Sequence, residues 1–201
     1  MRLRPVLVGI LLVVSRASVN AAERQVQLFI AVSFNGNTTF ALVDYSARRP
    51  SIFYGGRARL LGEIVGVEAD FGDAPGYFQP GDPNLPGGPI VLHSRVTTLT
   101  GNIIVAVPRR LTEYTLRPFF VGGAGLMRAR AVDIFGALPV ADTLPAIDVG
   151  GGVSGFLTEQ IGLAWDLRHF RSLGGNEQSS ETNFGQQLSF WRASMALAIR
   201  F

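Results

Sequence analysis

The 201-residue chain contains no cysteine and no lysine, and it has only two histidines. The absence of cysteine excludes disulfides, thiolate metal sites and cysteine nucleophiles. Charged residues make up only 16% of the chain, and the net charge of +3 is too small and too scattered to indicate a nucleic-acid partner. Hydrophobic residues make up 47%, a share that suggests a membrane protein, yet after residue 22 no run approaches the eighteen or so apolar residues of a spanning helix. Only a closed β-barrel spans a membrane without such runs, because its backbone groups are all satisfied between strands.

The first 22 residues have the organisation of a secretory signal peptide. Arg2 and Arg4 form a positively charged start, and Pro5–Val14 form an apolar segment of about ten residues. Small residues at 19–22 then offer cleavage sites, and no cysteine is present there to carry a lipid anchor. We therefore expect a signal peptide over residues 1–22 and one mature domain over residues 23–201, located beyond the inner membrane.

The mature sequence alternates apolar and polar residues with a period of two, which is typical of β-strands with one apolar face. The final segment is the clearest case, because its apolar face continues to an aromatic at residue 201. Something must pair with such a strand and cover it, since chain ends usually fray into water. Eight strands are predicted: Gln25–Phe34, Phe53–Leu61, Ile64–Gly72, Val96–Val107, Thr115–Ala131, Ile147–Leu157, Ile161–Phe170 and Leu188–Phe201.

The predicted connections alternate in length. Those after the first, third, fifth and seventh strands run to roughly fourteen to twenty residues, and the others to about two to seven. Together with an even strand count, this pattern predicts an all-β fold: an eight-stranded antiparallel up-and-down transmembrane β-barrel with both termini in the periplasm. The four long connections, which we expect outside the cell, are Asn35–Ser51, Asp73–His93, Val132–Pro145 and Ser172–Gln186.

The strand faces opposite the apolar ones carry many charges. A soluble barrel could not bury so many against hydrocarbon, because each unpaired buried ion costs several kcal/mol. A transmembrane barrel reverses the usual order, with a polar lumen and an apolar outer face. Eight strands enclose a space that side chains can fill, so we interpret these residues as a structural network of ion pairs in the lumen. Its predicted members are Arg57, Arg59, Glu68, Asp70, Arg128, Arg130, Asp148, Asp166, Arg168, Arg192 and Arg200.

Two segments and the terminal aromatic carry a resemblance to a known superfamily. Leu116–Gly125 is similar to the arginine-proline-aromatic, then glycine-rich, strand of the OmpA-like and OmpX-like outer-membrane barrels of Gram-negative bacteria, and Gly66–Phe71 looks like their acidic third strand. The resemblance implies an outer-membrane location and contact with outer-membrane lipid and lipopolysaccharide. It also implies that the final strand is the signal recognised by the outer-membrane assembly machinery, through Trp191, Met195, Leu197, Ile199 and Phe201.

The function expected from these observations is a structural and surface-interaction role, in which the long connections contact an extracellular partner. Three alternatives stay open: a narrow solute pore, a lipid-modifying enzyme such as a lipid A acyl hydrolase or transferase, and a secreted soluble barrel of lipocalin type. His93 beside Ser94, and His169 near Ser172, are the candidates for an enzyme. No orienting carboxylate lies at a suitable spacing from either pair. We therefore expect no catalytic residues, no cofactor and no metal site.

Overall fold

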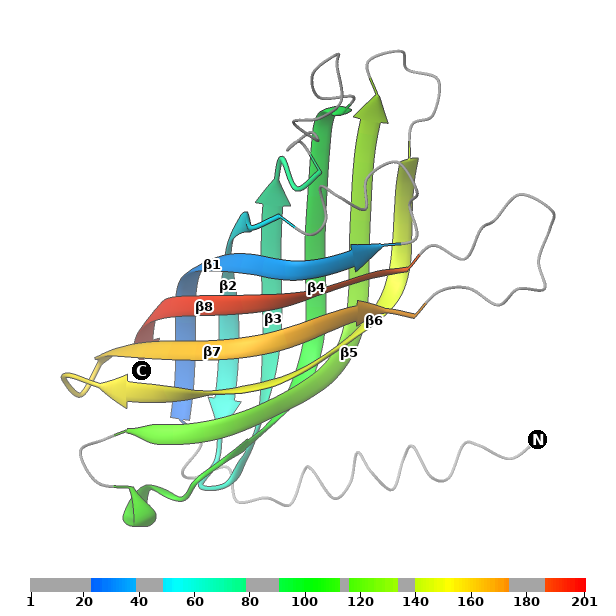
Figure 1. Ribbon diagram of the computed structural model, residues 1–201. Helices are drawn as coiled ribbons and strands as arrows, with labels where there is room; N and C mark the ends of the chain where they lie inside the picture. The colour runs from blue at the N-terminus through cyan, green and yellow to red at the C-terminus, as the bar shows by residue number, and fades with distance from the viewer. Residues whose placement is uncertain (1–22, 39–48, 79–90, 113–115, 134–139, 174–186) are drawn as a thin grey trace, which may run out of the picture.

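The computed structural model describes residues 23–38, 49–78, 91–112, 116–133, 140–173 and 187–201, so the signal-peptide prediction for residues 1–22 lies outside the described residues. Eight antiparallel strands pair in chain order and close into a barrel through a ladder between the first and the last (Figure 1). The predicted eight-stranded up-and-down barrel is confirmed. The strands are β1 (Glu23–Thr38), β2 (Ser51–Leu61), β3 (Val65–Pro75), β4 (Val91–Ala106), β5 (Arg117–Asp133), β6 (Val140–Phe156), β7 (Ile161–Ser172) and β8 (Leu188–Arg200).

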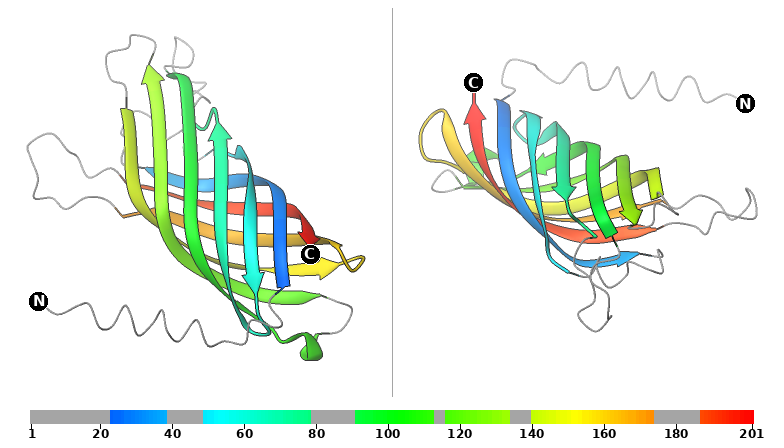
Figure 2. Two further views of the ribbon diagram at one scale, coloured as in Figure 1. Left: turned by 180° about the vertical axis from the view of Figure 1, so that it is seen from behind. Right: turned by 90° about the horizontal axis from the view of Figure 1, so that it is seen from above.

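The described residues include no helix that is long and apolar enough to cross a membrane. The start of β1 pairs with the end of β8, as in the partners Gln25 and Arg200, so both ends of the described chain lie at the same end of the barrel. We call this the terminal end, and the opposite end, to which β1, β3, β5 and β7 run, the loop end (Figures 1 and 2).

The register of the ladders determines how strongly the strands tilt. A path of directly paired residues can be followed around the barrel from Glu23, one step per strand. It returns to β1 at Ser33, ten residues further along the strand than its start. A shift of ten residues over eight strands corresponds to a tilt of about 41° from the barrel axis. Each residue then advances about 2.5 Å along the axis, and a row of paired residues rises by about 3 Å per strand from β1 towards β8. These values allow residues on different strands to be compared in height.

The outward face of the barrel is apolar over a continuous belt. Its side chains, such as Leu28 and Ile103, are 65% and 61% exposed, and they alternate along their strands with buried residues that face the lumen. From Val65 near the terminal end to Phe34 near the loop end, the belt is about 24 Å tall by the geometry above. A soluble lipocalin-type barrel requires polar side chains on this face, so the structure disfavours that alternative.

The lengths of the connections agree with the predicted alternation in part. Long connections follow β1, β3 and β7, and short ones follow β2 and β6. The connection from β4 to β5, residues 107–116, is however longer than that from β5 to β6, residues 134–139, and it contains the 3-10 turn η2 (Arg109–Leu111). The reason is that β5 and β6 stay paired as far as Ala131 and Val140, so much of the predicted loop is strand. Residues 39–48, 79–90, 134–139 and 174–186 of the predicted loops lie outside the described residues.

The faces of β5 are the reverse of those predicted. Phe119 and Met127 are buried in the barrel, while Arg128 and Arg130 are exposed on its outer surface, so neither arginine belongs to the lumen. Arg117 explains the parity of the strand, because it points inward and donates hydrogen bonds to the carbonyl oxygens of residues 62, 63 and 107 at 2.9, 2.6 and 3.1 Å. With Arg117 fixed inside, the odd-numbered residues of β5 as far as Ala129 face the lumen.

Candidate functional site

A layer of paired charges fills the lumen near the middle of the apolar belt. It contains four arginines and four carboxylates from β2, β3, β6, β7 and β8, and their side chains are 0% or 1% exposed. The equal numbers make the layer electrically neutral. The members of this lumen network are Arg57, Arg59, Glu68, Asp70, Asp148, Asp166, Arg168 and Arg192.

Arg168 of β7 joins both sides of the barrel. Its Nη1 and Nη2 donate to Glu68 Oε1 and Oε2 of β3 at 2.6 and 3.1 Å, across the lumen. Its Nε donates to Asp166 Oδ1 at 3.0 Å. The Nη1 atom also lies 3.5 Å from Asp148 Oδ2, and this is a weak contact, because the Asp148 oxygens accept no hydrogen bond from the described residues. Since its Nη1 is also 3.7 Å from Asp70 Oδ2, Arg168 lies within ion-pair distance of all four carboxylates of the layer.

Arg57 of β2 makes a second bridge. Its Nε donates to Asp70 Oδ2 at 2.7 Å, its Nη2 donates to Ser194 Oγ at 2.7 Å, and its Nη1 donates to Asp166. The register places Arg57 directly opposite Asp70 and Arg59 directly opposite Glu68, with Arg59 Nε 2.5 Å from Glu68 Oε2. The bridge therefore joins β2 to β3, β7 and β8.

Arg192 of β8 completes the layer. Its Nη2 donates to both carboxylate oxygens of Asp70, at 2.9 and 2.7 Å. Its guanidinium carbon lies 4.8 Å from the ring centroid of Phe29 and 4.4 Å from that of Phe170, so aromatic faces cover the charge. The contacts with Phe170 connect the layer to the apolar side chains that lie above it.

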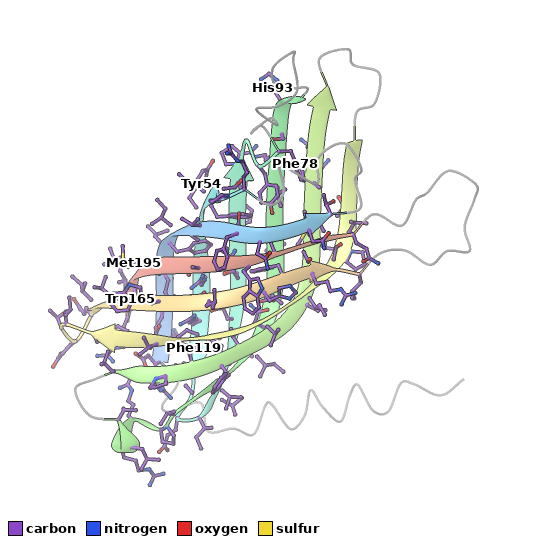
Figure 3. The ribbon with its side chains drawn as sticks, in the orientation of Figure 1. Tyr54, Phe78, His93, Phe119, Trp165 and Met195 are labelled. Atoms are coloured by element: carbon purple, nitrogen blue, oxygen red, sulfur yellow. The ribbon has the colours of Figure 1, made fainter. Side chains whose placement is uncertain are left out.

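An aromatic cap closes the lumen on the loop side of the network. The rings of Phe53 and Phe190 are stacked 5.3 Å apart, Phe170 stacks on Phe190 at 5.4 Å, and Tyr77 packs at 5.7 Å from Phe190. All four side chains are fully buried. Burial raises the pKa of the Tyr77 phenol above its usual value, so this group remains neutral. Phe78, which is labelled in Figure 3, packs edge-on against Tyr77 and extends the cap.

The terminal end of the lumen has its own charged group. Arg200, predicted to join the central network, lies at this mouth instead, where it donates to Glu23 Oε1 at 3.1 Å and to the Glu159 carbonyl at 2.7 Å. Glu23 also pairs with Arg109 and lies 3.6 Å from Arg117 Nη1. These residues line a cavity of about 510 Å³ that opens to the outside. Arg200 is separated from the network because it is the last inward residue of β8, below the level of the central charges.

The residues of the predicted assembly signal lie on the outer face of β8. Met195, Leu197 and Ile199 are about half exposed, and Trp191 is partly covered by His169 at a ring distance of 5.0 Å. Figure 3 shows Met195 beside its partner Trp165 on the outer surface. Phe201 is 73% exposed, and its backbone N–H donates to the Arg24 carbonyl at 3.2 Å, next to the start of β1. These side chains form a continuous apolar outer face on the closing strand.

The two histidine–serine pairs do not form catalytic dyads. His93 is exposed at the loop end of β4 (Figure 3), whereas Ser94 is buried and its Oγ accepts from the Phe78 N–H at 2.8 Å. His169 faces outward, whereas Ser172 faces the lumen and accepts from the Leu188 N–H. In the described part of the chain, no cluster of three or more histidine, aspartate or glutamate side chains is placed to hold a metal ion.

Several residues that shape the lumen were not predicted from the sequence. Glu23 and Arg117 lie at strand ends, where alternation is weak evidence. Phe170 and Phe190 occupy the polar parity of their strands, and this exception to the alternation was the available signal for an apolar cap.

Neither a family model nor a curated protein matches the sequence. Similar folds occur among solved structures. Neisserial surface protein A has 13% identity and a TM-score of 0.59, and the match covers 89% of this chain and 97% of that one. The N-terminal barrel domain of Pseudomonas aeruginosa OprF has 15% identity and a TM-score of 0.54, with 90% and 98% covered. Ail of Yersinia pestis, solved with the heparin analogue sucrose octasulfate, has 13% identity and a TM-score of 0.52, with 90% and 99% covered. At such identities the likeness concerns the fold, and this chain has the fold of the eight-stranded outer-membrane β-barrels.

Proposed function

We propose that this protein is an integral outer-membrane barrel of a Gram-negative bacterium, which acts as a closed anchor and presents its loop end outside the cell. The observation that carries the proposal is the reversed polarity of the barrel. An apolar belt of about 24 Å surrounds a lumen of paired charges, and this height is close to the 25 Å or so of apolar surface on known transmembrane barrels. Water on the outside would leave this belt unfavourably exposed, and lipid covers it.

The contents of the lumen favour an anchor over a narrow pore. Arg168 and Glu68 meet across the middle of the barrel, and the aromatic cap of Phe53, Tyr77, Phe170 and Phe190 fills the level above them. An ion entering from the loop end would meet buried rings and then an electrically neutral layer of four arginines and four carboxylates. Both features oppose conduction, because they leave neither room nor net field for a solute.

The proposal includes an orientation and a route of assembly. The longer connections after β1, β3 and β7 lie at the loop end, which supports an extracellular position for this end and a periplasmic position for both termini. The apolar outer face of β8, which ends at Phe201, is the surface that we propose the outer-membrane assembly machinery recognises. We assign no catalytic role, because each histidine lies on the opposite side of the barrel wall from its neighbouring serine.

The first test combines folding with conductance. Protein folded into phospholipid vesicles is run on SDS gels with and without boiling, and is then recorded in planar bilayers. We expect a mobility shift on boiling, as for a detergent-resistant barrel, and no discrete conductance steps. A shift accompanied by stable ion conductance would replace the anchor with the pore alternative. The absence of a shift, with a fold that is soluble without detergent, would overturn the membrane location.

Orientation is tested by surface labelling of intact cells. An epitope is inserted between residues 79 and 90 in one variant, and in the turn at 157–160 in a matched control. We expect antibody to label only the first variant in intact cells and both after permeabilisation. Labelling of the control alone would reverse the orientation.

A further inference from the structure

Three arginines interrupt the outer surface of the barrel near the loop end. Arg95 of β4 and Arg130 of β5 are direct cross-strand partners, and Arg128 lies two residues before Arg130 on the same face. All three are exposed and point away from the lumen. We call them the outer arginine cluster. Like charges directly opposite each other on a sheet are destabilising, so their placement requires a compensating negative charge.

One aspartate supplies part of this compensation and fixes the position of Arg95. Asp73 of β3 accepts hydrogen bonds from Arg95 Nε and Nη2 at 2.8 and 2.9 Å and from Thr97 Oγ1 at 2.8 Å. The Asp73 side chain is only 5% exposed, while that of Arg95 remains 55% exposed. Arg95 is thus held in place with one edge of its guanidinium open to the outside.

Arg128 and Arg130 differ from Arg95 in this respect. Among residues whose side chains the structure describes, none forms an ion pair with Arg128 or Arg130. Three arginines and one aspartate leave a net charge of +2 on three adjacent strands, β3, β4 and β5. Two guanidinium groups and the open edge of a third form a set of donors that matches the several oxygens of a phosphate group.

The position of the cluster indicates the kind of molecule that carries the phosphate. Arg128, the lowest member of the cluster, is paired with Thr97. The next outward-facing row below it is Leu99 with Leu126, which are 53% and 50% exposed. By the tilt derived above, the three arginines lie in the first layers above the apolar belt, at about the height where lipid headgroups begin. A ligand that fits this surface has phosphate above and hydrocarbon below.

We propose that the outer arginine cluster binds the phosphate groups of a glycolipid in the outer leaflet, with the lipid's acyl chains lying along Leu99 and Leu126. This inference rests on the proposed outer-membrane location and adds a defined lipid site to it. A soluble polyanion would reach the arginines equally well but would gain nothing from the leucines. The lipid is therefore the favoured occupant.

Binding is measured with the full mature chain folded in detergent micelles. Native mass spectrometry gives the apparent Kd for lipid A with two phosphates, for the same lipid after removal of its phosphates, and for inorganic pyrophosphate. Arg128→Gln/Arg130→Gln removes two of the three positive charges of the cluster. Arg24→Gln/Arg110→Gln is the matched control, because it removes two exposed arginines at the terminal end.

We expect the double variant in the cluster to bind lipid A about thirtyfold more weakly than the wild type, from the usual contribution of a basic residue near an anionic membrane surface. The control should bind as the wild type does, and the dephosphorylated lipid should bind weakly to every protein. Equal affinity of the double variant and the wild type would overturn the inference. So would equal wild-type affinity for lipid A with and without phosphate, a result that requires no variant to fold.

The remaining outcomes separate this inference from the proposed function. If pyrophosphate binds as tightly as lipid A, the cluster is a site for soluble anions and the lipid assignment is wrong. If the wild type shows no heat-modifiable barrel in vesicles, the outer-membrane proposal itself fails. A heat-modifiable barrel with phosphate-independent lipid binding refutes only the site.

Discussion

Replacement of Arg168 by methionine tests whether the lumen network stabilises the barrel. The substitution keeps an unbranched side chain of similar length but removes three charge-assisted hydrogen bonds, two to Glu68 and one to Asp166. It also removes the cation nearest to Asp148 and leaves the neutral layer with a net charge of −1. The carboxylates that remain are buried and short of partners.

The magnitude follows from two opposing contributions. Hydrogen bonds to charged groups contribute about 1.5–3 kcal/mol each, so three of them amount to roughly 5–9 kcal/mol. The methionine variant avoids the free-energy cost of burying a guanidinium, and this offsets several kcal/mol of the loss. We expect Arg168→Met to lower the free energy of unfolding by about 3–5 kcal/mol, as is usual when one partner of a buried ion pair is removed.

The assay is urea unfolding in phospholipid vesicles, followed by tryptophan fluorescence. The chain has two tryptophans, Trp165 and Trp191, and both lie on the outer face, where their emission reports contact with lipid. Arg128→Met is the matched control, since it makes the same change on the outer surface near the loop end. We expect the control to change stability by no more than about 1 kcal/mol, because charges near the membrane interface cost little.

A double-mutant cycle makes the test specific for the ion pair. Glu68→Gln combined with Arg168→Met restores a neutral lumen, so the double variant should be more stable than the sum of the single effects by about 1–3 kcal/mol. If the free energy of unfolding of Arg168→Met lies within about 1 kcal/mol of that of the Arg128→Met control, the remaining lumen charges are well solvated without Arg168. In that case the reasoning that the network holds the strands together is refuted.

Three further predictions concern close packing, the aromatic cap and assembly. Gly123→Ala should destabilise the barrel by about 1–3 kcal/mol in the same unfolding assay, because its Cβ would overlap the Gly101 carbonyl oxygen. In Gly101→Ala the Cβ has no neighbour nearer than 4.0 Å, so the free energy of unfolding should stay within about 1 kcal/mol of the wild-type value. Equal effects of the two substitutions would contradict this reasoning. Phe190→Ala should cost about 3–5 kcal/mol by opening a cavity in the cap, and Phe190→Leu less than half as much, so equal losses would argue against a packing role. Deletion of Phe201 should lower the amount of barrel assembled in cells without abolishing folding in vesicles. Phe120→Ala, which changes an aromatic of the same 73% exposure, should assemble normally. Assembly of both variants is measured by heat-modifiable migration of membrane fractions.

Alternation was sufficient to predict the eight strands, because it records on which side of the barrel wall each residue lies, and the lengths of the connections added the up-and-down order. In β1, β7 and β8 nearly every inward side chain is polar or small and nearly every outward one is apolar, so strand identity and faces agree with the prediction. The strand ends towards the loops were less predictable. β3, β4 and β5 continue into segments rich in turn-forming or charged residues, since pairing with a neighbouring strand can extend a strand beyond its own apolar pattern.

The reversed faces of β5 show where alternation fails. Its odd-numbered residues include Phe119 and Met127, which read as lipid-facing, but they fill apolar parts of the lumen. A barrel interior that is polar in the middle and apolar at other levels gives no constant rule for the inward face. The parity of this strand depends instead on Arg117 and the three carbonyl groups to which it is bonded, and two of these belong to the distant turn after β2. Such a contact joins separate parts of the chain and cannot be read from local sequence.

The same reversal connects the interior of the barrel to its outer surface. Because Arg117 holds the odd-numbered residues inside, the even-numbered arginines 128 and 130 must face outward, although the apolar belt ends just below them. Inward arginines at these positions would have placed two positive charges at the level of the aromatic cap, above a layer that is already neutral with four of each sign. Their outward position keeps these charges out of the apolar part of the lumen. On the lipid-site proposal, the charge at the outer rim is balanced by lipid phosphates, which are the nearest abundant anions in a membrane.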